Sequence, residues 1–469
     1  MNPPAGEPRP VVSGALVRAH AYVAFLGFVI PLGFALILAA KFVWPDFLGS
    51  VPWLQFGRIR VFHTNGVIYG WLSTAFLSIL YYVIPKLAGR PLLSERLAWW
   101  TFWVWNLGLV LGLGAILAGQ MQGIEYAEFP PLADVVFAAG FVMALVNLLG
   151  TIFASPEKQL YVSSWYFILG FAFTALNYVM ANIVPTFLAP GAAGAAITGL
   201  WIHNAVGLWI TPIGVGLVYF FLPVLLKRPI YSHALSLVGF WTLSFFYPLG
   251  GAHHFFFSPI PWWLQVLAVP LTVVLFAVVA TVIYNWLATL KGEWKQVPGN
   301  MALRYLATGI IAYFATCTQG PFHTFFSVQK VIHFTDWVVA HAHLALLGAF
   351  TYFNLAAFTY IWPRVTGKEF YSKKLAESAY WMVTIGFYVF YFLPLTALGL
   401  VEGYLWMSPA PFAESVIQAI PFWFSRLIGG VLIYGGLCAF AYNCWMTHRA
   451  GARAPAAVLE EAEAAGVAI

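Results

Sequence analysis

Long apolar runs, broken by short polar stretches that contain proline or glycine, repeat along almost the whole chain. An α-helix needs about 20 apolar residues to cross a bilayer core of about 30 Å. We therefore predict an all-α integral membrane protein with one domain, residues 1–469, whose membrane core covers about residues 15–449. Twelve spans are predicted, near residues 20–42, 61–85, 97–119, 132–154, 160–184, 196–225, 232–257, 262–290, 302–325, 331–362, 375–401 and 416–447.

Three stretches depart from this pattern. Residues 1–12 are polar and rich in proline, and they lack the basic-then-apolar layout of a cleaved signal peptide, so we expect none. Residues 184–196 are the most irregular part of the predicted membrane core. Alanine and glutamate dominate after Arg453, and we expect residues 450–469 to form a disordered tail.

Composition supports a membrane protein and excludes other classes. Hydrophobic residues make up 62% of the chain and charged residues only 8%, whereas soluble domains carry about 25% charged residues. A soluble enzyme, a disordered protein and a nucleic-acid binder are excluded, despite the net charge of +6. The three cysteines lie inside apolar runs, so no disulfide or thiolate–metal framework is expected.

The distribution of basic residues predicts the orientation. If the N-terminus is inside, most of the 22 Lys and Arg residues fall on the inner side, and only Lys41, Arg58, Arg60 and Lys330 fall on the outer side. Basic loops stay in the cytoplasm, so we predict cytoplasmic N- and C-termini. The basic composition therefore reports membrane insertion rather than an acidic partner.

Six histidines lie inside predicted spans, where ionisable groups are costly and usually functional. Counting residues from the span ends places all six in the outer half of the membrane, on four different helices. A structural role remains open for any one of them alone, but a shared depth favours one common site. They are His63, His203, His253, His254, His341 and His343.

Neutral imidazole is a good ligand for iron and copper. His63 and His343 could supply both axial ligands of a six-coordinate haem, and His341 the single ligand of a second haem. Residues two apart on a helix project about 200° apart. His341 and His343 can therefore face two haems on opposite sides of one helix.

The other three histidines can hold a copper ion with one coordination position left open. His253 and His254 are adjacent in sequence, which suits chelation only where the helix is irregular. Pro248 and the glycines after it provide that irregularity. His203 would complete the set from another span.

Several motifs together carry a family resemblance over nearly the whole chain, from Phe56 to Thr447. The chain resembles the catalytic subunit of the haem–copper oxidase superfamily, most closely the C-family, cbb(3)-type cytochrome c oxidase. It is also similar to the large subunit of nitric oxide reductases. The matching segments are GRIRVFHTNG (57–66), IEYAE (124–128), WIHNAVG (201–207), FLPVLLKRPIYS (221–232), YPLGGAHH (247–254), HFTDWVVAHAH (333–343) and RLIGG with AYNCW (426–445).

The resemblance implies specific roles for the histidines. His63 and His343 correspond to the axial ligands of a low-spin haem b, and His341 to the ligand of a high-spin haem of b type. The remaining three histidines correspond to the copper ligands. Tyr247 stands where this family has a tyrosine covalently linked to a copper-ligand histidine, here His203, and such a phenol can donate an electron and a proton.

Polar residues at the outer side are implicated by the same resemblance. Arg58, Arg60, His333 and Asp336 lie near haem ligands and could hold haem propionates, since arginine forks suit carboxylates. Outer-loop salt bridging is the alternative. Glu125 matches a residue that joins the propionates at a calcium ion, a cation that prefers oxygen ligands.

A proton route from the inside is also expected. Ser244 and Ser236 share one helical face with Tyr247, and Tyr231 lies near the inner mouth. Tyr313 matches a tyrosine that the family uses in its proton channel. The alternative is that the serine hydroxyls only bond the preceding turn of their own helix.

Two positions bear on the choice between oxygen and nitric oxide. Gln319 replaces a glutamate that the cbb(3) type usually has near the active site, and PFHTFF (321–326) looks more like the nitric oxide reductases. Gly207 argues the other way, because those reductases carry glutamate there beside a non-haem iron. We therefore expect an oxygen reductase, with nitric oxide reductase as the first alternative and a transporter as the second.

The implied activity is reduction of O2 to water with inner-side protons, coupled to proton translocation across a bacterial or archaeal cytoplasmic membrane. No C-x-x-C-H motif for covalent haem occurs in the chain. Electrons should therefore come from cytochrome c through c-type cytochrome subunits of the same complex.

Overall fold

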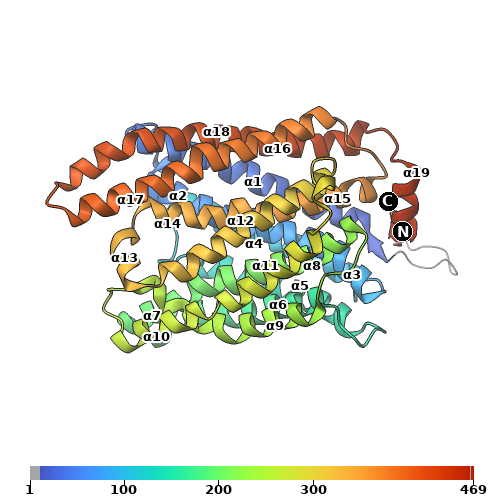
Figure 1. The fold of residues 1–469 in the computed structure, drawn as a ribbon, viewed down its shortest axis with the longest axis horizontal. Helices are drawn as coiled ribbons and strands as arrows, with labels where there is room; N and C mark the ends of the chain where they lie inside the picture. Colours follow the sequence, from blue (N-terminus) through green and yellow to red (C-terminus); the bar gives the residue numbers. More distant parts are fainter. Residues whose placement is uncertain (1–10, 465, 469) are drawn as a thin grey trace.

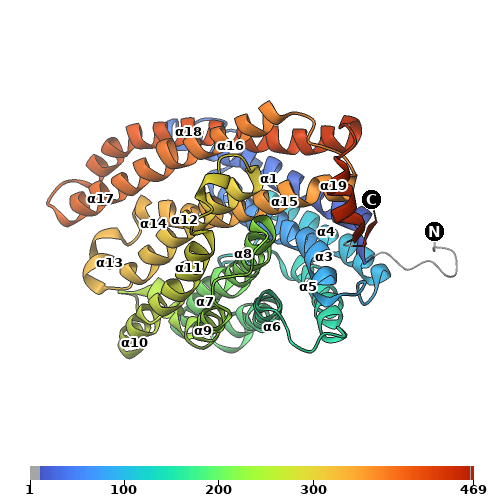
Figure 2. The same cartoon turned by 45° about the vertical axis from the view of Figure 1, so that its right-hand side comes forward.

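The computed structural model describes residues 11–464 and 466–468, so most of the segment tested for a signal peptide lies outside the described residues. The chain is almost entirely helical, and the long helices run side by side along the longest axis in both views (Figures 1 and 2). The α-helices are α1 (Gly14–Val43), α2 (Phe56–Asn65), α3 (Thr74–Ala88), α4 (Glu95–Ala118), α5 (Pro131–Phe153), α6 (Val162–Ile183), α7 (Ala192–Ala205), α8 (Thr211–Leu226), α9 (His233–Phe246), α10 (Trp262–Val273), α11 (Phe276–Leu290), α12 (Met301–His323), α13 (Phe326–Ile332), α14 (Asp336–His343), α15 (Tyr352–Thr366), α16 (Lys373–Phe387), α17 (Leu393–Met407), α18 (Phe412–Ala450) and α19 (Ala456–Ala464). Shorter segments are β1 (Val12–Ser13), η1 (Pro52–Leu54), η2 (Gly66–Ser73), η3 (Val184–Leu188), η4 (Val206–Ile210), η5 (Tyr247–Phe255), η6 (Trp294–Gln296), η7 (Leu344–Thr351), η8 (Tyr388–Phe392) and β2 (Val467–Ala468).

The expected all-α membrane fold is confirmed. Within the described residues, 11 helical stretches are long and apolar enough to cross a membrane. The remaining predicted span, residues 302–325, corresponds to α12, which has 23 residues. Arg304, Gln319 and several threonines lower its hydropathy, but at 1.5 Å per residue it is still long enough to cross the bilayer core.

Three spans form the centre of the bundle. In Phe56–Ala88, Ala192–Leu226 and Asp336–Thr366, 94%, 83% and 78% of the most apolar stretch is buried, against 50% or less in the other candidate spans. Each central span contains a widened, π-type segment, namely η2, η4 or η7. These segments begin within three residues of His63, His203 or His343, and such segments often occur at functional sites.

One span boundary agrees with the prediction in detail, and another differs from it. Helix α6 continues into η3, and a short break precedes α7, which agrees with the irregularity expected at residues 184–196. The tenth span begins at Asp336 rather than near 331. The backbone of Phe334 is left-handed, with φ of 66°, which ends α13 before α14 can begin.

The C-terminal residues are ordered over the described part, contrary to the expected disordered tail. Residues Val467–Ala468 form strand β2, which pairs in parallel with β1 at Val12–Ser13. The backbone N–H of Ala454 donates to the carbonyl of Gly367, and α19 lies at the end of the bundle where both strands meet (Figure 1). The strand pairing and backbone hydrogen bonds anchor this segment, and its composition alone does not reveal them.

Candidate metal centre

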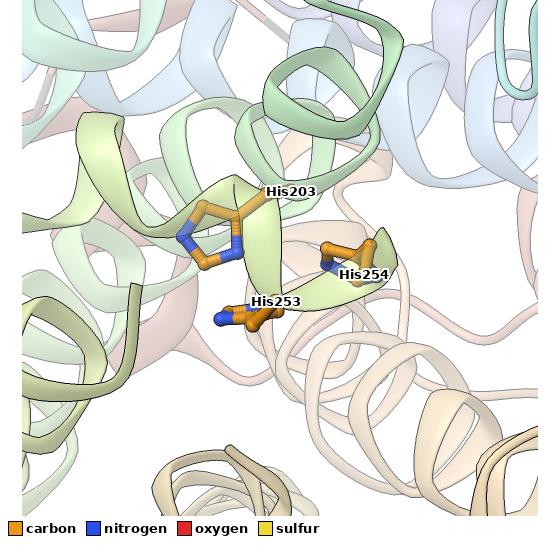
Figure 3. Close-up of side chains that lie close together, drawn as sticks. All are labelled: His203, His253 and His254. Atoms are coloured by element: carbon orange, nitrogen blue, oxygen red, sulfur yellow. The ribbon is translucent and has the colours of Figure 1, made fainter. Parts of the chain in front are cut away.

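Three histidines from two separate parts of the chain converge on one point. His203 lies in the last turn of α7, and His253 and His254 lie in η5 (Figure 3). One ring nitrogen of each lies within 4.8 Å of the others. Three imidazoles at this spacing suit copper, leaving a coordination position free for a further ligand.

The irregular backbone expected near Pro248 is present. Segment η5 is a tight 3-10 turn that begins with Tyr247 and Pro248, and its glycines permit very close approaches. A Cβ atom added at Gly250 would lie 3.1 Å from Nε2 of His203. In addition, Nδ1 of His253 lies 2.9 Å from the Thr272 hydroxyl, which fixes the ring and leaves Nε2 for a metal.

Tyr247 lies directly on His203. The two ring centroids are 3.9 Å apart with an interplanar angle of 14°, and Nε2 of His203 is 3.0 Å from the backbone oxygen of Tyr247. A Cβ atom added at Gly207 would lie only 1.7 Å from Cε1 of Tyr247. Position 207 therefore cannot carry a glutamate while the tyrosine ring occupies this place.

A cavity of about 340 Å³ adjoins the three histidines and also reaches His341, Tyr313, Glu125 and His333. Nδ1 of His341 lies 3.0 Å from Oε1 of Gln319, so Gln319 contacts this ring rather than an open proton route. His323, which was not predicted, also lines the cavity. Its ring centroid lies 4.5 Å from that of His341, and the PFHTFF segment was its only sequence signal.

His63 and His343 both line a second cavity, of about 150 Å³. Their rings are nearly parallel, at 12°, with centroids 6.3 Å apart. Two metal–nitrogen bonds of about 2 Å each, with both ring radii added, span a distance of about 6 Å. The pair therefore fits the axial ligation of a six-coordinate haem.

Hydrogen bonds orient these two rings. Nδ1 of His63 lies 3.3 Å from the carbonyl of Pro31, and Nδ1 of His343 lies 2.9 Å from the carbonyl of Val339. Such a bond leaves Nε2 of His63 for a metal, whereas Nε2 of His343 has a hydrogen-bond partner that a metal would replace. The hydroxyl of Tyr391, another residue missed in the sequence, lies 3.0 Å from Nε2 of His343.

One helix separates the two cavities. His343 lines the smaller cavity and His341 the larger, as their spacing predicted, while Ala342 and Leu346 line both. The two cofactor positions would therefore be adjacent, with a single layer of side chains between them.

Arg426 supplies a buried cation beside the His63–His343 cavity. It lines that cavity, and its Nε and Nη1 atoms have no hydrogen-bond partner within the described residues. Its Nη1 lies 3.8 Å from a carboxylate oxygen of Asp336, and the two side chains are 9% and 10% exposed. A guanidinium with two nitrogens free of hydrogen bonds fits a cofactor that carries carboxylates, such as haem propionates. Its only sequence signal was an arginine inside a span.

Of the other residues predicted to hold propionates or calcium, some line a cavity and others do not. Arg60 and Glu125 form an ion pair at 3.8 Å, and both are nearly half exposed. Glu125 and His333 line the larger cavity. Arg58 differs from the expectation, because it donates to the carbonyl of Leu117 at the end of α4 and lines neither cavity.

Of the expected proton-route residues on α9 and α12, only Tyr313 is buried at the cavity wall. Ser236 and Ser244 donate to the carbonyls of His233 and Phe240 in their own helix, as the structural alternative predicted. Tyr231 is 57% exposed. The three lie outside the lining of both cavities.

Comparison with known proteins agrees with this geometry. The family model described as "Cytochrome C and Quinol oxidase polypeptide I" matches residues 15–432. A "Cbb3-type cytochrome c oxidase subunit CcoN1" of Stutzerimonas stutzeri is 30% identical, over 93% of this chain and 95% of that protein. A nitric oxide reductase polypeptide of the same organism is 27% identical, over 92% and 94%.

A solved structure supports the fold. A heme-copper terminal oxidase dimer, determined by cryo-electron microscopy, matches with a TM-score of 0.75 and 14% identity, over 94% of this chain and 86% of that chain. The family model covers most of the sequence, including all six histidines. The chain belongs to the cytochrome c and quinol oxidase polypeptide I family, the subunit I family of the haem–copper oxidases.

Proposed function

We propose that this chain is the catalytic subunit of a membrane-bound cytochrome c oxidase, which reduces O2 to two molecules of water with four electrons and four protons. The observation that carries the proposal is the contact between Tyr247 and His203 beside three clustered imidazoles, with Gly207 making room for the tyrosine. Three imidazoles with a phenol suit copper, whereas harder oxygen ligands would suit iron.

The positions of the rings support the following residue roles. His203, His253 and His254 hold copper, and His341 binds the high-spin haem of b type across the same cavity. The pair His63 and His343 binds a low-spin haem b. When bound, the copper and the two haems supply the electron transfer to O2.

Side chains of the protein supply a proton at the O2 site and neutralise the charge of the haem propionates. The phenol of Tyr247 donates a proton and an electron at the O2 site, and Tyr313 holds a proton near it. Arg426 and His333 neutralise haem propionates, and Glu125 with Arg60 forms the outer edge of a calcium position. Gln319 accepts the hydrogen bond of the His341 Nδ1–H and so orients that ring.

The protein belongs in a multi-span membrane complex of the oxidase type. We propose that c-type cytochrome subunits, with cytochrome c as the donor, deliver electrons from the outer side. Inner-side protons reach the site by way of Tyr313 on α12, and the reaction is coupled to proton translocation. The single membrane unit, residues 15–449, would have both termini in the cytoplasm of a bacterial or archaeal cell.

Nitric oxide reduction is the second candidate, favoured by the PFHTFF segment, which places His323 beside His341, and by the 27% identical relative. Gly207 opposes it, because a glutamate ligand there would collide with Tyr247.

Replacing Tyr247 by Phe tests the proposal. We expect O2 reduction to be abolished while the absorption bands of both haems remain, because the ring keeps its packing and loses only its hydroxyl. Tyr284→Phe, an exposed tyrosine on α11, is the matched control and should keep full turnover. Full turnover of Tyr247→Phe would refute the role of the phenol.

A further inference from the structure

A third cavity, of about 510 Å³, lies away from the metal centre, at the end of the bundle that carries α19 (Figure 1). It is formed by the ends of α3, α8 and α15, the beginning of α12, and α19. Three of these helices belong to the three most buried spans of the bundle. The cavity therefore opens at the middle of this end and not on the lipid-facing circumference.

The cavity carries an excess of positive charge. Lys86, Lys227 and Arg364 line it, and Glu461 of α19 is the one carboxylate among its lining residues. The three cations lie at the C-terminal ends of helices, where positive charge is favourable. That preference explains their sign, but it does not explain why an open space is left between them.

Arg364 is held in a fixed orientation. Its guanidinium lies 3.6 Å from the centroid of the Tyr360 ring, and Nη1 donates to the Tyr360 carbonyl at 2.7 Å. Nη2 donates to Oε2 of Glu461 at 2.5 Å, while the buried Nε has no partner within the described residues. A planar fork that is already immobilised suits a carboxylate or a phosphate.

Lys86 and Lys227 are less completely paired. Nζ of Lys227 lies 3.7 Å from Oε1 of Glu461, so this carboxylate spans two of the three cations. Nζ of Lys86 donates to the Tyr82 hydroxyl at 3.3 Å, and within the described residues it forms no ion pair. Two positive charges therefore remain for a further anion.

The beginning of α12 adds backbone donors to the same cavity. Asn300 caps the helix by accepting from the N–H of Leu303, and Met301 and Ala302 line the cavity. The N–H groups of Met301 and Ala302 have no acceptor in the described part of the chain. Free N–H groups at a helix N-terminus bind anions, phosphate in particular.

We propose that this cavity binds a phosphate-bearing anion that arrives from the aqueous phase on the inner side, and that Glu461 is the tethered carboxylate which the anion displaces. Glu461 comes from a helix outside the membrane-spanning bundle, so it can leave without disturbing the core. Arg364 lowers the pKa of Glu461, which keeps the carboxylate charged and therefore a competitor.

The test uses inorganic pyrophosphate and the intact oxidase complex in nanodiscs. Calorimetric titration should show saturable binding, which Glu461→Gln strengthens about tenfold, because a charge-assisted internal competitor is removed. Lys86→Gln and Arg364→Gln should each weaken binding at least tenfold. Arg228→Gln is the matched control, since Arg228 pairs with Glu293 outside the cavity, and it should leave binding unchanged.

Hydrogen–deuterium exchange gives a second readout, because pyrophosphate should speed exchange in residues 456–464 of the wild type. Haem absorption checks that each variant is assembled. Absence of binding in both the wild type and Glu461→Gln would overturn the proposal. It would also be overturned if native mass spectrometry found an anionic phospholipid that Arg364→Gln loses, with no response to pyrophosphate, because the occupant would then be a lipid headgroup.

Discussion

The hydrogen bond between His341 and Gln319 should influence the reduction potential of the high-spin haem. Nδ1 of His341 lies 3.0 Å from Oε1 of Gln319, both inside the bundle. The amide oxygen is a neutral acceptor, and a carboxylate in its place would pull the imidazole proton more strongly. A more electron-rich ring stabilises the oxidised iron, so Gln319→Glu should lower the potential.

The expected magnitude follows from the two kinds of hydrogen bond. Bonds to neutral groups contribute about 1 kcal/mol and bonds to charged groups about 1.5–3 kcal/mol. The difference is about tenfold in an equilibrium constant, or about 59 mV for one electron. Gln319→Leu removes the acceptor and should shift the potential upward.

Redox titration of the high-spin haem, together with the iron–histidine stretching frequency from resonance Raman spectroscopy, measures the effect. The low-spin haem in the same sample is the internal control, because its ligands lie in the other cavity. A merely structural Gln319 would leave the potential and the frequency unchanged in Gln319→Glu. That result would contradict an effect of this hydrogen bond on the haem.

Three further predictions concern other parts of the site. Gly207→Ala should displace the Tyr247 ring and lower turnover at least tenfold with both haems retained. Gly114→Ala is the control and should leave turnover unchanged, because the added Cβ would meet no other part of the structure beyond its own helix backbone within 4 Å. Arg426→Gln should destabilise the complex by about 3 kcal/mol, since it leaves a buried carboxylate unpaired, and thermal loss of the low-spin band measures this. Burial raises the pKa of Glu128, in the loop before α5, to about 7. Its infrared carboxyl band should be present in acid and half lost near pH 7, and Glu128→Gln should remove it.

Each of these has a contrary result. Normal turnover in Gly207→Ala would mean that O2 reduction does not depend on the position of the Tyr247 ring. Unchanged thermal stability in Arg426→Gln would show that Arg426 does not stabilise the haem pocket. A carboxyl band that disappears near pH 4.5 would show that Glu128 is solvated rather than buried.

The spans could be predicted from the sequence, and the six histidines could be recognised as candidate ligands, because both inferences depend on local properties. Hydropathy and helix length determine which residues lie in the membrane, and the rise per residue gives their depth. The two-residue spacing of His341 and His343 was sufficient to predict that they face different cavities. The irregular turn at η5 could be read from Pro248 and its glycines in the same way.

Features that depend on distant partners could not be read from the sequence. Arg58 bonds a carbonyl 59 residues away, and Gln319 meets His341 across 22 residues. Arg426 is recognisable as a cofactor partner only when its unpartnered nitrogens are seen at a cavity wall. The π-type segments depend on a shift in backbone hydrogen bonding, and the ordered C-terminal residues depend on pairing with β1 at the other end of the chain.

We propose that three imidazoles hold copper, with a tyrosine and a haem beside it, at a site that reduces oxygen. Metal analysis and a haem count on the purified complex, with O2 and NO consumption measured side by side, test it most directly. We expect this chain to contribute two b-type haems and one copper, and the complex to consume O2. A non-haem iron in place of the copper, with faster consumption of NO than of O2, would contradict it.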